Sequence, residues 1–176
     1  MAEFRDINET HQAPDGELYI ALASHPTLVW DIPRSSTAPG TAPIIHTRNN
    51  GANQRWRLEV DHDSGVYTFF RIINVHSGLA LAVQPDRTIT QQPRAEAGHS
   101  QPAGRRQLWA MGYPGFTGST FDPAKPAQPH PTGSQGTRLR ILEHGPVDAT
   151  PVASGTRIAL SRGAAFETGW TFIAAT

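Results

Sequence analysis

The chain has no cysteine, so disulfide bonds and thiol chemistry are excluded. It also has no excess of either charge, because 15 Lys and Arg residues balance 15 Asp and Glu residues. A surface that binds the phosphate backbone needs an excess of basic residues. We therefore expect no nucleic acid partner.

Long apolar runs are lacking as well. No segment approaches the roughly 20 apolar residues that cross a bilayer, so we expect no membrane insertion. The first twelve positions, MAEFRDINETHQ, are polar and lack the apolar centre of a secretory signal. The expected location is therefore cytoplasmic, with release by a non-classical route as the alternative.

Sequence motifs of enzymes and metal sites are missing too. The 8 histidines are scattered without the spacing of a zinc site, and Asp61-His62-Asp63 is typical of a charged turn. The stretch GFTGS at 115–119 does not fit the G-x-S-x-G of serine hydrolases, and no glycine-rich loop is suited to a phosphate. We expect no metal ion, no cofactor and no enzymatic activity.

Glycine and proline are abundant, with 16 and 15 residues in a chain of 176. Together they exceed the usual share of roughly 12 %, which favours many short strands joined by turns over long helices. Apolar segments rich in β-branched and aromatic residues predict strands at 18–22, 69–75 and 138–142. Turn signals follow at Asn50-Gly51, at 63–65 and at 76–78.

A short phrase recurs along the chain. Gln stands two places before Trp in both Gln54-Arg55-Trp56 and Gln107-Leu108-Trp109, and a third Trp follows at 170 with Thr in place of the Gln. The segments GTAPIIH and GTRIALS precede the first and third Trp at nearly the same distance. Repeats of this kind indicate units that cannot bury their apolar faces alone.

These recurrences predict one domain over 1–176, built from three repeats at about 15–60, 66–112 and 137–174. The three Trp side chains should form a shared core, each with its indole N–H bonded to a local acceptor. The stretch 113–136 is rich in Pro and Gly, which predicts a long surface loop or insertion. A linker between two domains is the alternative, although about forty residues beyond it could hardly fold alone.

Three repeats that end in Q-x-W or, in the third, in the similar T-x-W resemble the ricin-B-type β-trefoil lectins from about Gly16 to Phe172. The stretch FRIINVHSGLALAV at 70–83 is similar to the second repeat of the fungal members, the Sclerotinia agglutinin in particular. NGANQRWRLEV at 50–60 is the other similar piece. The resemblance implies an all-β fold, a β-trefoil in which six strands close a barrel and three hairpins cap one end around a pseudo-threefold axis.

In that family a sugar is held by an Asp after the second strand, a ring on the third and the Asn of N-Q-x-W. The resemblance implies that Asp31, His46 and Asn53 fill these places in the first repeat. Neighbouring side chains would line the rim or steady the loop. The predicted carbohydrate-binding residues are Asp31, His46, Arg48, Asn49, Asn53 and Gln54.

The other two repeats lack parts of this set. Ala82 and Arg106 stand in the places of Asp and Asn in the second repeat, and the third offers Asp148 with Ser161 and Glu167. We therefore expect one working pocket. Plain structural explanations stay open: an Asp that caps a turn, a strand histidine, and an ordinary turn Asn.

The resemblance implies a lectin whose partners are glycans with terminal galactose or N-acetylgalactosamine. One weak site per chain gains useful avidity only in an oligomer, so we expect a homodimer. The alternative is a β-trefoil protease inhibitor that inserts the 113–136 loop into a protease cleft. A targeting module cut from a larger toxin or hydrolase is a third possibility, which no feature of the sequence supports.

Overall fold

The computed structural model describes residues 14–63, 68–96, 98–112, 138–142, 145–161 and 169–176. The predicted insertion 113–136 lies outside these ranges, as do Glu167 and the end of the turn signal at 63–65. Within the described residues, no helix has the length and apolar character needed to cross a membrane.

Twelve strands make up the described part of the chain, and the helical elements there are single turns. The strands at 18–22, 69–75 and 138–142 are confirmed to within one residue. The first group of strands is β1 (Leu18–Leu22), β2 (Leu28–Asp31), β3 (Ile44–Thr47) and β4 (Trp56–Asp63). The second group is β5 (Thr68–Asn74), β6 (Ala80–Val83), β7 (Ile89–Gln92) and β8 (Trp109–Gly112). The third is β9 (Arg138–Ile141), β10 (Gly145–Asp148), β11 (Ala159–Leu160) and β12 (Trp170–Ala174). The helical turns are η1 (Pro33–Ser35), η2 (Ala52–Gln54), η3 (Gly98–Ser100) and α1 (Pro102–Arg105).

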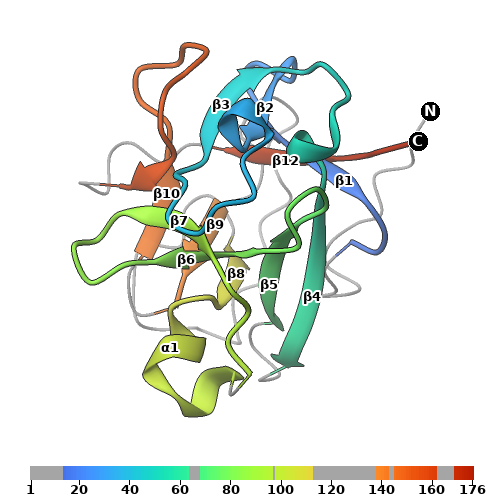
Figure 1. Ribbon diagram of the computed structural model, residues 1–176. Helices are drawn as coiled ribbons and strands as arrows, with labels where there is room; N and C mark the ends of the chain where they lie inside the picture. Colours follow the sequence, from blue (N-terminus) through green and yellow to red (C-terminus); the bar gives the residue numbers. More distant parts are fainter. Residues whose placement is uncertain (1–13, 64–67, 97, 113–137, 143–144, 162–168) are drawn as a thin grey trace, which may run out of the picture.

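The strand pairing repeats three times. In each group the second and third strands form an antiparallel hairpin, as in β2–β3, β6–β7 and β10–β11. The first and fourth strands join one group to the next through the pairs β4–β5, β8–β9 and β12–β1. The pairs β1–β4 and β5–β8 link the outer strands within a group. This is the predicted β-trefoil, and Figure 1 shows the long β4–β5 pair running away from the β2–β3 hairpin.

The predicted tryptophan core is confirmed. Trp56, Trp109 and Trp170 each have 0% exposed surface. Their indole N–H groups donate to backbone carbonyls at equivalent places on the second strand of each group. The acceptors are the oxygens of Trp30 at 3.2 Å, Leu81 at 3.1 Å and Val147 at 3.3 Å. Each large ring is thus buried without leaving its polar atom unpaired, which would cost about 1–3 kcal/mol.

A fourth tryptophan, Trp30, occupies the centre of the core. Its ring centroid lies 6.1 Å from that of Trp56, 5.7 Å from Trp109 and 5.1 Å from Trp170. All three contacts are edge-on, the arrangement that aromatic quadrupoles favour. The indole nitrogen of Trp30 is buried and has no hydrogen-bond partner among the described residues. The first group of strands therefore contributes a second tryptophan, Trp30, which contacts the core tryptophans of all three groups.

The two segments with similar sequence, 40–46 and 155–161, lie side by side. The N–H of Ile45 donates to the carbonyl of Thr156 at 2.8 Å, and that of Gly155 donates to Ile45 at 2.7 Å. Gly40 and Gly155 have matching φ angles of 89° and 92°, a conformation that glycine adopts without strain. These bonds fix the start of β3, which carries part of the candidate site.

Candidate functional site

The β2–β3 hairpin presents Asp31 and His46 on one face. Asp31 is paired with Ile44 and Val29 with His46, so these positions share one side of the alternating strands. Trp30 and its partner Ile45 face the opposite side, where both join the main core. The core residues thus determine which way the predicted ligand-binding residues point.

The carboxylate of Asp31 is almost wholly buried, with 4% exposed surface. Its Oδ2 accepts hydrogen bonds from Gln54 Nε2 at 2.8 Å and from Asn53 Nδ2 at 3.1 Å. Asn53 Nδ2 also donates to the carbonyl of Ile32 at 3.0 Å. Hydrogen bonds to an ionised group are worth about 1.5–3 kcal/mol each. The two amides therefore hold the carboxylate in one orientation.

Two acceptor oxygens of this network remain unused. Within the described part of the chain, nothing donates to Oδ1 of Asp31 or to Oδ1 of Asn53. Neither oxygen is among the fully buried side-chain atoms that lack a partner, so each keeps some contact with solvent although Asp31 and Asn53 are only 4% and 8% exposed. Each side chain is fixed by its other atom. The result is a pair of pre-oriented acceptors that are open to a hydroxyl donor.

Gln54 ties this network to the loop that follows β3. Its Nε2 donates to the carbonyl of Thr47 at 3.0 Å, and its Oε1 accepts from the backbone N–H of Asn49 at 2.8 Å. The Gln of the second Q-x-W phrase acts in the same way. Gln107 donates to the carbonyl of Pro93 at 2.7 Å and accepts from the N–H of Ala95 at 2.9 Å. The recurring Gln therefore holds the loop after the third strand, with or without a binding site.

The remaining predicted residues are exposed: His46 lies on β3, and Arg48 and Asn49 lie on the loop that follows it. His46 is exposed, and its Nδ1 donates to the carbonyl of Thr47 at 3.0 Å; within the described residues its Nε2 makes no hydrogen bond. The guanidinium carbon of Arg48 lies 5.4 Å from the ring centre of Tyr19. Asn49 Oδ1 accepts from the N–H of Gly51 at 2.8 Å, so this side chain shapes the turn. The structure joins Asp31, Asn53 and Gln54 in one network and places the others beside it.

The turn signal Asn50-Gly51 marks a turn, but not a two-residue hairpin. A type I′ hairpin needs positive φ at both positions, whereas φ is 63° at Asn50 and −66° at Gly51. The chain enters η2 instead, which places Asn53 and Gln54 against β2.

Two residues outside the N-Q-x-W motif, Gly51 and Asn74, also position Asn53. A Cβ atom added at Gly51 would lie 2.5 Å from Asn53 Oδ1, so only glycine leaves room for this amide. Asn74, at the end of β5, donates from Nδ2 to the backbone carbonyl of Asn53 at 3.0 Å. Its Oδ1 accepts from the N–H groups of His76 and Ser77, both at 3.1 Å. The only sequence signal for Asn74 was the turn that follows it.

The other two hairpins differ at the position of Asp31. The pairing of Ala82 with Thr90 and of Asp148 with Ala159 shows that both stand in register with it. Ala82 offers no oxygen acceptor. Burial raises the pKa of Asp148, and a hydrogen bond with Ser161 opposes this shift only in part. Among the described residues, Asp148 has no counterpart of the two amide donors that hold Asp31.

Comparison with known proteins places this geometry in context. Residues 8–92 match the family model described as the ricin-type beta-trefoil lectin domain-like family. This segment contains β1 to β7 and every predicted site residue. No curated protein sequence matches the chain.

Solved structures share the fold at low sequence identity. The designed threefold-symmetric protein ThreeFoil is 20% identical with a TM-score of 0.63, covering 91% of this chain and 99% of its own. The Rhizoctonia solani agglutinin is 18% identical with a TM-score of 0.64, covering 92% and 96%. The C-terminal half of the earthworm R-type lectin, solved in complex with GalNAc, is 16% identical with a TM-score of 0.55, covering 91% and 98%.

The fold also occurs as part of larger proteins. The chain spans 17% of a mosquitocidal holotoxin and 31% of an exo-beta-1,3-galactanase from Clostridium thermocellum, at 14% and 21% identity and TM-scores of 0.66 and 0.61.

Proposed function

We propose that this protein binds carbohydrate through Asp31, Asn53 and His46, and that it catalyses no reaction. The observation that carries the proposal is the pair of acceptor oxygens, Oδ1 of Asp31 and Oδ1 of Asn53, that are left without a donor. Each is held in place because the other polar atom of its side chain is hydrogen-bonded. Sugar hydroxyls donate to such acceptors, and the bond to a carboxylate is the stronger one. Because the side chains are already ordered, a small neutral ligand loses little affinity in fixing them.

His46 supplies the second element of the site. Its imidazole can cover the apolar C–H face of a pyranose, and its Nε2 can exchange a hydrogen bond with a hydroxyl. An imidazole offers less surface than an indole, so we expect affinity between about millimolar and tens of micromolar. Gln54 contributes indirectly because it bonds to the carbonyl of Thr47, the neighbour of His46, and to the loop that follows β3.

The comparisons support a glycan as partner. The matched family model is that of a lectin domain, and the similar structures include an agglutinin and a lectin solved with GalNAc. From this we propose specificity for terminal galactose or N-acetylgalactosamine and a kinship with the fungal agglutinins, including that of Sclerotinia. Weak single-site binding further suggests a homodimer. We propose a cytoplasmic location, with release by a non-classical route as the alternative.

One working site per chain follows from the differences between the hairpins. Ala82 removes the carboxylate from the second, and Asp148 in the third has no counterpart of the two amide donors among the described residues. Nothing in the described residues favours the protease-inhibitor alternative, whose loop 113–136 lies outside them.

A glycan array with matched Asp→Asn variants tests the proposal. In Asp31→Asn, the new side-chain oxygen can still accept from Gln54 and Asn53, whereas the free acceptor becomes an NH₂ donor. The fold should therefore survive, while affinity for the best glycan falls at least about tenfold, as expected for one charged hydrogen bond. Asp148→Asn changes the equivalent position of the third group and should bind like the wild type.

Titration calorimetry on the best array hit gives the affinities. A folded Asp31→Asn variant that binds as well as the wild type would place the site elsewhere in the molecule. If the wild type binds no glycan at any density, the lectin proposal is refuted.

A further inference from the structure

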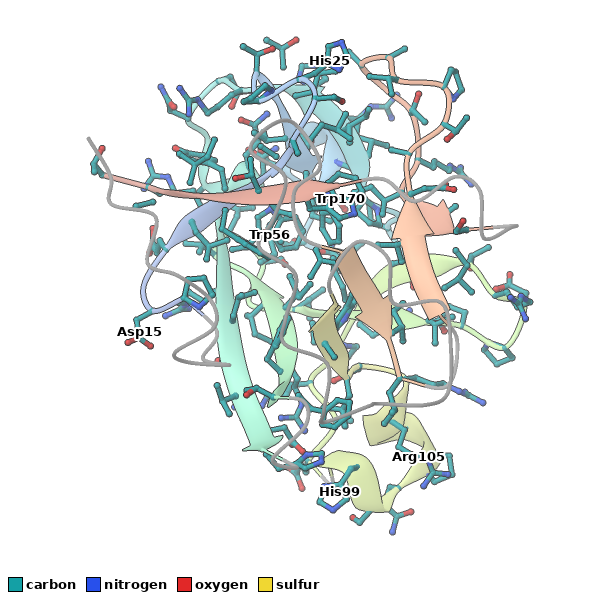
Figure 2. All side chains as sticks on the ribbon, turned by 180° about the vertical axis from the view of Figure 1, so that it is seen from behind. Asp15, His25, Trp56, His99, Arg105 and Trp170 are labelled. Carbon is teal, nitrogen blue, oxygen red and sulfur yellow. The ribbon has the colours of Figure 1, made fainter. Side chains whose placement is uncertain are left out.

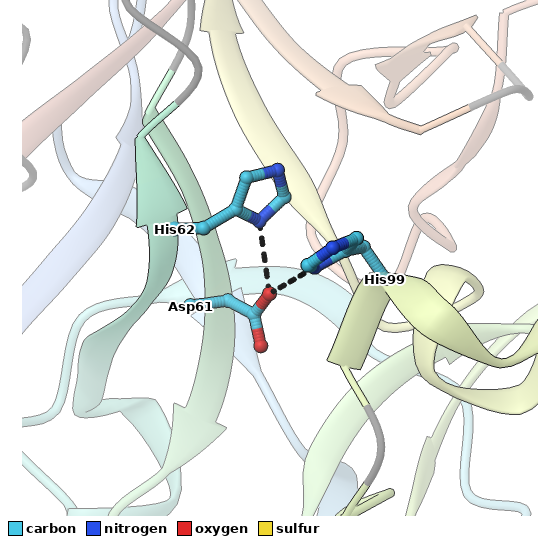
Figure 3. Close-up of side chains that lie close together, drawn as sticks. All are labelled: Asp61, His62 and His99. Atoms are coloured by element: carbon cyan, nitrogen blue, oxygen red, sulfur yellow. Dashed lines mark hydrogen bonds and ion pairs between the residues drawn. The ribbon is translucent and has the colours of Figure 1, made fainter.

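Three potential metal ligands converge far from the candidate sugar site. Asp61 and His62 lie on β4, and His99 lies in η3 of the next group of strands. Both rings direct Nδ1 at one oxygen, with His62 at 2.9 Å and His99 at 3.4 Å from Asp61 Oδ2 (Figure 3). One ligand atom from each of the three residues lies within 4.8 Å of the others.

A β-bulge makes this convergence possible. Successive side chains of a regular strand point to opposite faces, so Asp61 and His62 would normally diverge. The β4–β5 register shifts between Val60, which pairs with Phe70, and His62, which pairs with Phe69. Asp61 is the extra residue. Bulges re-aim side chains and are common beside functional sites.

Neighbouring side chains fix the orientation of the three groups. Arg71 donates from Nη2 to Asp61 Oδ1 at 2.9 Å, which leaves Oδ2 for the histidines. The His62 ring stacks on Phe69, with centroids 4.7 Å apart and planes at 22°. Contacts of this kind around a metal site orient the ligands and are part of its affinity.

The three side chains bring one carboxylate and two imidazoles together at one point.

We propose that Asp61, His62 and His99 bind a divalent late first-row metal ion, with Zn²⁺ as the reference ion. Zinc binds nitrogen and oxygen ligands at about 2.0–2.2 Å. Two ligand atoms on one ion then lie about 2.9 Å apart at octahedral angles and about 3.4 Å apart at tetrahedral angles. The two distances from Asp61 Oδ2, 2.9 Å and 3.4 Å, fall in the range that ligand atoms of one ion span, so small side-chain adjustments would suffice to bind it. Imidazole ligands favour zinc, nickel or copper over magnesium or calcium.

The expected affinity is moderate. The side chain of His99 is 60% exposed, and the charge of Arg71 offsets that of the carboxylate. Three protein ligands leave room for water or for a fourth group. A micromolar site is therefore expected, weaker than the closed four-ligand sites that fold zinc fingers.

The bound ion would tie two parts of the chain together. It would link the end of β4 to η3, and so the first group of strands to the second. Figure 2 shows His99 and His25 at opposite ends of the molecule. His25 lies in the sequence just before β2, the strand that carries Asp31 of the candidate sugar site. The metal site is therefore independent of the proposed carbohydrate function.

Calorimetric titration of the full chain, without an affinity tag, with Zn²⁺ tests the proposal. His99→Gln is the informative variant because this exposed side chain can be changed without opening the core. His25→Gln is the matched control, since His25 is also exposed and its side chain bonds only to Ser24 in the described structure. Wild type and His25→Gln should bind one ion per chain with micromolar affinity, and His99→Gln should bind at least about tenfold more weakly.

Two further readouts make the result specific. Zn²⁺ should raise the thermal unfolding midpoint of the wild type and of His25→Gln by several degrees, with little effect on His99→Gln. Co²⁺ in place of Zn²⁺ should give visible absorption bands that His99→Gln lacks. The proposal is overturned if the wild type binds no stoichiometric ion, or if His99→Gln binds as tightly as the wild type. Either outcome would leave the group as a metal-free carboxylate–imidazole contact.

Discussion

Replacing Gln54 with Ala should destabilise the fold more than the same change at Gln107, although the two residues hold equivalent loops in the first and second groups of strands. Each variant loses two neutral hydrogen bonds to loop backbone, worth about 1 kcal/mol each. Gln54→Ala also loses the bond to the Asp31 carboxylate, worth about 1.5–3 kcal/mol. The expected losses are about 4 kcal/mol for Gln54→Ala and about 2 kcal/mol for Gln107→Ala, before a similar cavity cost in both.

Equilibrium unfolding in urea measures this difference, provided that both variants keep the wild-type m-value. A double variant that also carries Asp31→Ala checks the cause. Once the Asp31 carboxylate is gone, Gln54→Ala should lower the free energy of unfolding by no more than Gln107→Ala does. The effects of Gln54→Ala and Asp31→Ala should therefore be non-additive by about 1.5–3 kcal/mol. Equal losses in the single variants would show that the carboxylate bond contributes nothing, and the reasoning would fail.

Three further outcomes are expected. Trp56→Phe should lower the free energy of unfolding by about 1–2 kcal/mol more than Trp30→Phe, because the N–H of Trp56 has a hydrogen-bond acceptor and that of Trp30 has none among the described residues. Thermal or urea unfolding measures this difference, and a larger loss for Trp30→Phe would contradict the assigned core contacts. Gly51→Ala should weaken glycan binding about tenfold, because the Cβ of the alanine would displace the Asn53 amide. An unchanged glycan affinity in calorimetry would exclude Asn53 from the site. Asp61, whose pKa is lowered, stabilises the fold above the ordinary carboxyl pKa and loses that contribution as pH falls below about 4. In Asp61→Asn the free energy of unfolding should therefore vary less between about pH 5 and pH 2, and a curve parallel to the wild type would argue against the contact.

Local sequence signals predicted the frame of the fold. The strand at 18–22 was visible because its apolar run is continuous, and the burial of Trp56, Trp109 and Trp170 followed from their recurrence. The central place of Trp30 could not be predicted in this way. Its sequence context resembles any strand tryptophan, and only the packing of three groups of strands puts it on the axis.

The candidate sugar site was predictable in composition but not in its contacts. The resemblance to the ricin-B-type lectins suggested a common site for Asp31, Asn53 and Gln54, whereas the sharing of one carboxylate oxygen emerged only from the structure. Gly51 carried a turn signal, yet its role in leaving room for an amide depends on atoms two residues away in a particular turn.

The cluster of Asp61, His62 and His99 was not predicted from the sequence. Asp61 and His62 were interpreted as part of a charged turn, and no metal ion was expected. His99 lies in another group of strands, and no short motif joins it to them. The bulge that brings them together is a property of β-strand register, which the residue pattern does not reveal.

The central claim is that sugar binds beside Asp31 and Asn53 in the first group of strands. The most direct test follows the side-chain amide signals of Asn53, Gln54 and Gln107 by NMR during titration with N-acetylgalactosamine. The account predicts that the signals of Asn53 and Gln54 shift and saturate together, while that of Gln107, which holds the equivalent loop without an Asp, stays in place. A shift at Gln107 alone, or no shift at saturating sugar, would contradict it.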